Sequence, residues 1–293
     1  VHVPDAAFMR RHTTQKLKVT LPGPMTICDT LADGYYGRRA DMAMRFAELL
    51  NAEAREIEAA GAEVIQFDEP AFNVFLEEVR EWGLPALERA MQGLRATTVV
   101  HICYGYGIEA NMQWKASLGD QWRQYEQIFP WINASSVQQV SLEFAGSRVP
   151  HEVLRLLPDK TLLVGAIEVL PGKLESAEEV AHNILEATRH VDSARLIPCT
   201  NCGMAPLPAA LARSKLQALG AGAALAVRAR GARAHGCDHR LGVHHARSVA
   251  LAAGARRHVA PRRRCAAAAD AEVLRAAGEG SLQEAGRLSP QQE

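Results

Sequence analysis

Short apolar runs alternate with longer stretches of helical period along residues 17–219. The short runs are rich in β-branched and aliphatic residues and predict strands at Leu17–Leu21, Glu63–Phe67, Thr98–Cys103, Gln138–Leu142, Leu162–Ile167 and Leu196–Pro198. The stretches between them predict helices at Ala40–Ala60, Phe72–Leu94, Asp120–Ile132, His151–Leu157, Ser176–Val191 and Pro206–Leu219. Strands that alternate with helices indicate an α/β fold with a parallel sheet and right-handed crossovers.

The strand runs are apolar throughout rather than alternating, which is typical of strands covered on both faces. A capping box, Ser-Ala-Glu-Glu from Ser176, marks the start of one helix. Six β/α units suit a doubly wound sheet, whereas a TIM barrel needs eight. Because the chain begins with Val1 rather than Met, we expect an N-terminal truncation, and two further units would complete a barrel. No dinucleotide or P-loop fingerprint follows any of the strand runs.

The composition changes after about Gly220. Residues 221–293 contain no Lys, Ile, Met, Asn, Thr, Phe, Tyr or Trp and are dominated by Ala, Arg, Gly and His. Such a segment has little from which to build a core. We therefore expect a domain over residues 1–220 and a separate tail over 221–293, which is either a disordered basic tail or an out-of-frame translation of GC-rich DNA.

Charge and cysteine content narrow the class of protein. The 33 basic residues balance the 33 acidic residues, which argues against nucleic-acid or membrane-surface binding through bulk charge. No apolar run is long enough for a membrane span, and no secretory signal is present at the start. The six cysteines are too scattered for a disulfide scaffold, so we expect a cytoplasmic protein with free or metal-bound thiols.

Polar side chains recur where the predicted strands end. His101 and Cys103 lie two residues apart and face the same side of a strand. Asp68, Glu143 and the pair Cys199 and Cys202 follow other strands, at the sheet edge where α/β proteins carry their chemistry. Alone, His-x-Cys is more often structural, and Cys-x-x-Cys also suits a redox pair. One histidine, one or two cysteines and one glutamate, each at a different strand end, together predict a catalytic zinc site, and zinc would hold a substrate thiol as a nucleophilic thiolate.

Five stretches in this order resemble the cobalamin-independent methionine synthases, above all their short single-barrel members: LPGPMT, IQFDEPAF, HICYG, VSLE with its later SR, and PCTNCGMAPL. The resemblance covers roughly Val19–Leu219. It implies a TIM (β/α)8 barrel, N-terminally truncated to six units, that transfers a methyl group from 5-methyltetrahydrofolate or another donor to homocysteine. It also implies Zn²⁺ ligands at His101, Cys103, Glu143 and Cys202. Asp68 matches the aspartate that binds the homocysteine amino group.

The chain departs from the family in three places. The first two strands of the family are absent, Leu170 stands about where long members have a proton-donating histidine, and nothing after about Gly220 matches. Glu69 and Arg148 lie in matching stretches but receive no role, Cys199 has no counterpart among the ligands, and no general acid is assigned. The alternatives are a related zinc enzyme that alkylates another thiol such as coenzyme M, and an inactive truncated remnant. An accessory protein is not excluded.

Overall fold

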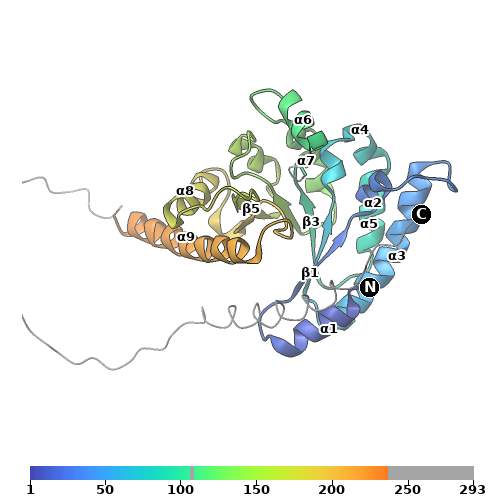
Figure 1. Ribbon diagram of the computed structural model, residues 1–293, viewed down its shortest axis with the longest axis horizontal. Coiled ribbons are helices and arrows are strands. Elements are labelled where there is room, and N and C mark those ends of the chain that lie inside the picture. The colour runs from blue at the N-terminus through green and yellow to red at the C-terminus, as the bar shows by residue number, and fades with distance from the viewer. Residues whose placement is uncertain (106–108, 237–293) are drawn as a thin grey trace, which may run out of the picture.

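The computed structural model describes residues 1–105 and 109–236 (Figure 1). One sheet of parallel strands runs in the order β1-β2-β3-β4-β5-β6, with bounds β1 (Lys18–Pro22), β2 (Val64–Asp68), β3 (Thr97–Ile102), β4 (Gln139–Leu142), β5 (Thr161–Ile167) and β6 (Leu196–Thr200). A doubly wound sheet reverses its strand order at a switch point, whereas a barrel adds each strand beside the last. The sequential order therefore confirms the predicted α/β fold and is that of a partial barrel.

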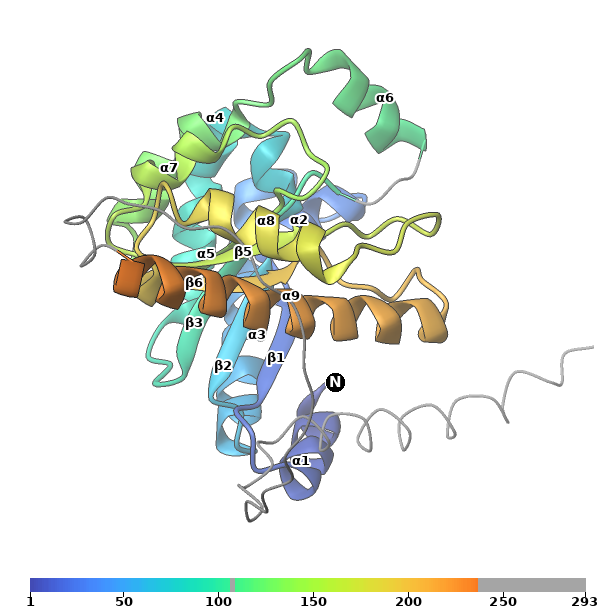
Figure 2. The same ribbon diagram turned by 90° about the vertical axis from the view of Figure 1, so that its left-hand side faces the viewer.

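Helices cover the outer face of this sheet (Figures 1 and 2). The α-helices are α1 (Val3–His12), α2 (Pro24–Thr30), α3 (Arg39–Ala59), α4 (Leu76–Glu78), α5 (Leu84–Met91), α6 (Glu109–Ser117), α7 (Gln124–Ala134), α8 (Ala177–Ala187) and α9 (Ala209–Gly236). The short 3₁₀ segments are η1 (Pro70–Asn73), η3 (His151–Leu156) and η4 (Ser193–Arg195), and η2 (Val79–Gly83) is a π-helical turn.

Two helical predictions were wrong in detail. The helix expected over Phe72–Leu94 is divided into η1, α4, η2 and α5. At its break, Gly83 lies so close to Met25 that a Cβ would come within 2.6 Å of the Met25 sulfur, and α5 begins directly afterwards with a proline in its first turn. The stretch expected over His151–Leu157 is a 3₁₀ segment that follows Pro150. Helices α1, α2 and α6 were not predicted.

Burial differs between the central and the outer strands. Nearly every position of β3 and β5 is buried, as the apolar runs predicted. The outer strands β1 and β6 are partly exposed, because each pairs on one side only within the described residues. Helix α7 buries Tyr125, Ile128 and Phe129 in the core, which confirms the helix predicted over Asp120–Ile132 except for its first turn.

Helix α9 runs past Gly220, where a domain boundary was expected. Gly222 lies against α8 so closely that a Cβ would come within 2.5 Å of the Val180 side chain, and Ala226 is buried in the same cluster. Residues 221–236 are thus helical, and α9 packs along α8 (Figure 2). The rest of the predicted tail, with Cys237 and Cys265, lies outside the described residues.

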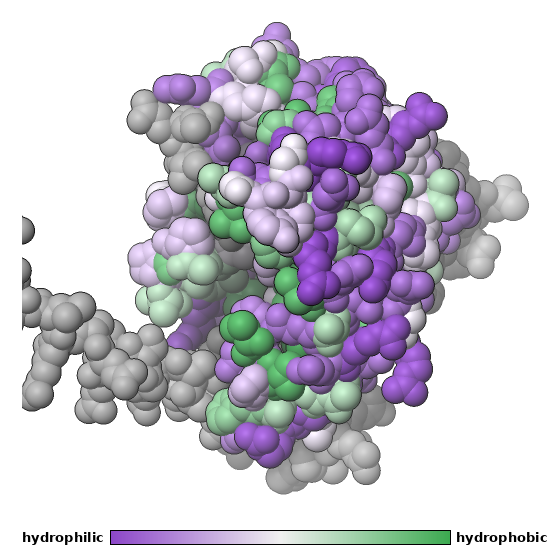
Figure 3. All heavy atoms as spheres, turned by 90° about the vertical axis from the view of Figure 1, so that its right-hand side faces the viewer, coloured by the Kyte–Doolittle hydropathy of each residue, from purple (hydrophilic) through white to green (hydrophobic). Residues whose placement is uncertain are grey.

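The outer surface on the side of α1 and α3 is mostly hydrophilic, with apolar groups scattered over it (Figure 3). This is the pattern expected of helices that turn one face to a core and the other to water. Among the described helices, none combines the length and the apolar character that a bilayer-spanning segment requires.

Candidate metal centre

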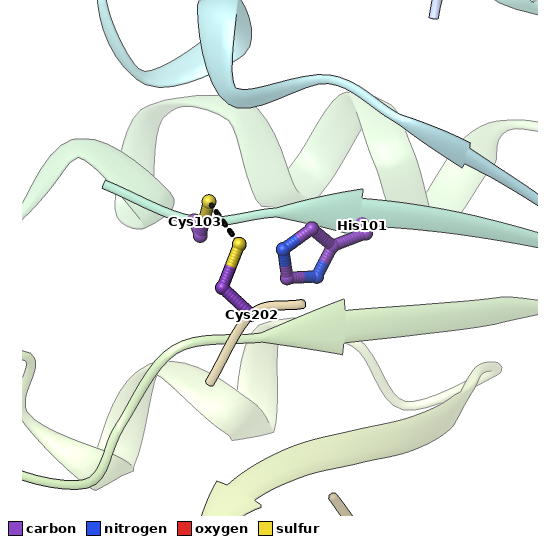
Figure 4. Close-up of side chains that lie close together, drawn as sticks. All are labelled: His101, Cys103 and Cys202. Carbon is purple, nitrogen blue, oxygen red and sulfur yellow. Dashed lines mark hydrogen bonds between the residues drawn. The ribbon is translucent and has the colours of Figure 1, made fainter. Parts of the chain in front are cut away.

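Three side chains converge at the carboxyl ends of β3 and β6 (Figure 4). His101 lies on β3, Cys103 follows that strand directly, and Cys202 follows β6. One ligand atom from each lies within 4.8 Å of the other two. The period of a strand explains why His101 and Cys103 share a face, and parallel pairing brings the strand ends to the same edge of the sheet.

The geometry of this cluster fits a metal ion. The sulfurs of Cys103 and Cys202 are 3.6 Å apart, too far for a disulfide of about 2.05 Å. Two thiolates on one tetrahedral zinc, with bonds of about 2.3 Å, would lie about 3.8 Å apart. The Nε2 atom of His101 is buried and has no hydrogen-bond partner of ordinary geometry among the described residues, so it is suited to bind a cation. One imidazole nitrogen and two sulfurs form a donor set that zinc prefers.

The residue before Cys202 anchors that end of the site. The side-chain oxygen of Asn201 accepts hydrogen bonds of 3.1 Å from the N–H groups of Phe144 and Ala145, and its amide nitrogen donates to the Ala145 carbonyl at 2.7 Å. Gly165 on β5 makes room for this contact, since a Cβ there would lie 2.1 Å from the Asn201 oxygen. The loop after β4 therefore fixes the backbone next to Cys202.

The two residues from β3 are anchored as well. The Asn73 amide donates a 3.0 Å hydrogen bond to the Cys103 carbonyl. The Nδ1 atom of His101 lies 3.0 Å from the hydroxyl of Ser141, on the neighbouring strand. These contacts hold the backbone of Cys103 and the ring of His101 in place without the help of an ion.

Burial and contact between neighbouring side chains shift the pKa values of the cluster. The pKa of the Cys103 thiol is raised well above its ordinary value, first by contact with the Cys202 sulfur and to a smaller extent by burial. Burial disfavours the charged form of His101, but contact with Cys202 and the charge of Asp68 outweigh it, so its pKa is raised. A cation that binds these ligand atoms would therefore have to displace protons from them.

Comparison with known proteins assigns this chain to a family. The sequence model of the family described as "Cobalamin-independent synthase, Catalytic domain" matches residues 2–224. The chain belongs to this family. A methionine synthase of Saccharolobus islandicus is 32% identical over 205 residues, which make up 69% of this chain and 56% of that protein. The chain thus spans just over half the length of the curated relatives it matches.

Solved structures agree with this assignment. The B12-independent methionine synthase from Shewanella sp. W3-18-1, in complex with selenomethionine, is 52% identical with a TM-score of 0.77, covering 79% of this chain and 68% of that one. A putative vitamin-B12 independent methionine synthase from Listeria monocytogenes, with 18% identity and a TM-score of 0.56 over 77% of this chain and 68% of that one, shares the fold. The family resemblance seen in the sequence is therefore confirmed.

Within this cobalamin-independent synthase domain, Glu143 lies beside the cluster but outside the group of atoms within 4.8 Å. Its carboxylate accepts a 2.9 Å hydrogen bond from the Tyr104 N–H and lies 3.6 Å from the ammonium of Lys115. Burial raises the pKa of Glu143, while Lys115 and the Tyr104 N–H oppose this shift. Its role as a fourth ligand stays a prediction.

Asp68 lies at the end of β2, where its backbone pairs with that of His101. The Gln66 amide donates a 2.7 Å hydrogen bond to one oxygen of the Asp68 carboxylate. Burial raises the pKa of Asp68, and the nearby His101 partly offsets this effect. The aspartate predicted to bind an amino group thus lies on the strand next to the cluster, and its role stays a prediction.

A cavity of about 160 Å³ opens beside Cys202 and Glu143. Its wall includes Lys115, Trp122 and the half-exposed Leu170. The sequence pattern did not single out Lys115. Trp122 lies in the stretch Asp120–Ile132 that was predicted to be a helix, and it both belongs to the hydrophobic core and lines this cavity.

Glu69 and Arg148 lie in stretches that resemble the family, and both make contacts that stabilise loops. Glu69 is fully buried and accepts hydrogen bonds from the Met25 and Thr26 N–H groups and from the Thr26 hydroxyl. Burial raises its pKa to about 7. Arg148 donates a 2.8 Å hydrogen bond to the Gly119 carbonyl. Both residues hold loops at the carboxyl edge of the sheet.

Proposed function

We propose that this chain is a zinc-dependent methyltransferase that forms methionine by transferring a methyl group to the thiol of homocysteine. The observation that carries this proposal is the cluster of His101, Cys103 and Cys202 in a cobalamin-independent synthase domain. The relatives with 32% and 52% identity are both named methionine synthases, which supports the same reaction here. The donor we propose is 5-methyltetrahydrofolate or another small methylated molecule.

His101, Cys103 and Cys202 would hold the metal, with the Glu143 carboxylate as the fourth protein ligand. Zinc bound there would supply a positive centre that keeps a substrate thiol in its thiolate form near neutral pH. Neither cysteine forms a disulfide among the described residues, and a reducing compartment such as the cytoplasm would keep both thiols available.

Asp68 would bind the ammonium group of homocysteine through a charge-assisted hydrogen bond. The Gln66 amide holds one carboxylate oxygen and leaves the other for the substrate. Because Asp68 pairs with His101 across the sheet, the amino acid would reach the cluster with its sulfur foremost. The side chain thus fixes which end of the substrate faces the donor.

The cavity beside Cys202 is where we place the methyl donor. In the transfer, the substrate sulfur forms a bond to the methyl carbon while the bond from that carbon to the donor breaks. The electron pair of the broken bond stays on the donor, which then takes up a proton. Alignment of the two reactants by fixed binding groups can supply several kcal/mol of the barrier.

Metal content and methyl transfer test the proposal together. We expect about one zinc per chain in the parent, with methionine formed from homocysteine, and loss of both in Cys202→Ser. Cys28→Ala is the matched control, because Cys28 is a buried cysteine outside the cluster and should leave zinc content unchanged.

Three results would contradict the proposal. Full turnover in zinc-free protein would exclude the zinc mechanism. Methyl transfer only to coenzyme M would reassign the acceptor. A zinc-loaded, folded chain that methylates neither thiol with any methylated donor would show that this chain is inactive.

A further inference from the structure

Ser141 lies on β4 directly beside His101. The two residues are register partners in the parallel sheet, and both are buried, at 4% and 3% exposure. The Ser141 hydroxyl oxygen lies 3.0 Å from Nδ1 of His101. It is thus the group that faces the ring nitrogen turned away from the two sulfurs, while Nε2 faces them (Figure 4).

The direction of this hydrogen bond follows from a second neighbour. The Ser141 hydroxyl also faces the thiol of Cys199 on β6, where it lowers the pKa of that thiol against the larger rise caused by burial. A serine hydroxyl has one hydrogen to donate and lone pairs with which to accept. If that hydrogen is given to the Cys199 sulfur, the oxygen accepts from His101, and Nδ1 carries the imidazole hydrogen. Nε2 then carries no hydrogen, which agrees with a buried atom that finds no hydrogen-bond partner of ordinary geometry in the described part of the chain.

We propose that Ser141 is a positioning residue that fixes the Nδ1–H tautomer of His101 and so leaves Nε2 as the ligand atom, with Cys199 completing the chain. The metal part of this inference rests on the proposed function, whereas the tautomer does not. Histidines that bind metals commonly donate their other N–H to such a partner, and loss of that partner typically weakens binding 10–100-fold.

The placement of β4 gives this role a structural basis. Ser141 lies on β4 and Glu143 directly follows that strand, just as His101 lies on β3 and Cys103 directly follows it. Ser141 supports His101, and Glu143 accepts the N–H of the residue that follows Cys103. Strand β4 therefore orients both residues that β3 contributes to the cluster.

Zinc affinity of purified variants, measured by competition with a chromophoric chelator, tests the metal part. We expect Ser141→Ala to weaken zinc binding about 10–100-fold and Ser141→Thr, which keeps the hydroxyl, to stay within about threefold of the parent. Thr98→Val is the matched control, since it removes a buried hydroxyl from β3 away from the ring. A folded Ser141→Ala protein with parent affinity would overturn the proposal.

The tautomer is read separately from ¹⁵N NMR of the histidine rings in the metal-free chain, at a pH above the raised pKa of His101 where the ring carries a single hydrogen, with His101→Gln to assign the signal. We expect the hydrogen on Nδ1 in the parent. A hydrogen on Nε2 would overturn the proposal, even if Ser141→Ala does not fold. If the parent binds no zinc, the proposed function fails, while the tautomer still decides the role of Ser141.

Discussion

Lys215 and Glu175 form an ion pair that is closed off from solvent. The ammonium of Lys215 on α9 lies 2.7 Å from the Glu175 carboxylate, and the two side chains are 0% and 1% exposed. The other oxygen of Glu175 accepts a 2.8 Å hydrogen bond from the Glu168 N–H, after β5. The pair therefore ties α9 to the loop that borders the cavity.

Lys215→Met should destabilise the fold by about 3–5 kcal/mol, because it leaves a buried carboxylate without its counter-charge. For a domain of this size, that loss corresponds to a fall in Tm of about 10 °C. The double variant Lys215→Met with Glu175→Leu removes both charges and should cost only about 1–3 kcal/mol, mainly because the Glu168 N–H loses its acceptor.

Urea unfolding followed by circular dichroism measures these differences. Lys173→Met is the matched control, since its pair with Glu168 is 45% exposed on the lysine side and should be worth less than about 1 kcal/mol. The reasoning is refuted if Lys215→Met lies within 1 kcal/mol of the parent, or if the double variant is less stable than the single one.

Three further changes probe other parts of the fold. The raised pKa of Glu69, about 7, means that the native state binds its proton more tightly than the unfolded chain, so stability should fall by about 3 kcal/mol between pH 4.5 and 7. Urea titrations of metal-free parent and Glu69→Gln over this range should show a slope that is steeper in the parent by this amount, because Asp68 and Glu143, whose pKa values are also raised, contribute equally to both. Gly222→Ala should destabilise the fold by about 1–3 kcal/mol, because the added Cβ clashes with Val180. Gly220→Ala has nothing within 4 Å of the added Cβ and should stabilise the fold by up to about 1 kcal/mol. Equal shifts of the thermal unfolding midpoint in the two variants would contradict the packing of α9. Tyr125→Phe should cost about 2 kcal/mol in chemical unfolding, because the hydroxyl bonds a β3 carbonyl at 2.5 Å and the N–H after β4 at 3.2 Å, and an unchanged midpoint would rule this out.

The sequence predicted the features that depend on the local spacing of apolar residues and on the residue types at the ends of strands. Apolar runs located all six strands, and the two-residue spacing of His101 and Cys103 placed both on one face. The capping box at Ser176 forms as expected, with both of its hydrogen bonds. These features follow from a few adjacent residues, so contacts between distant residues have little effect on them.

Other features depend on contacts between distant residues. Lys115 reaches Glu143 from a helix 28 residues earlier, and no local pattern encodes that approach. The helix was predicted to end at Leu219, yet α9 continues beyond it, and Gly222 permits α9 to pack closely on α8. The break near Gly83 likewise follows from its contact with Met25, which belongs to another helix.

The cluster joins parts of the chain that are far apart. Cys103 and Cys202 are separated by 99 positions, and their strands β3 and β6 have two strands between them. An ion held by both sulfurs would act as a cross-link that closes this long loop, and a covalent link over a loop of about 100 residues removes roughly 4–5 kcal/mol of chain entropy from the unfolded state. Metal loading would therefore lower the unfolding rate or raise the unfolding midpoint of the whole second half of the sheet. During synthesis, that cross-link could form only after β6 has been made.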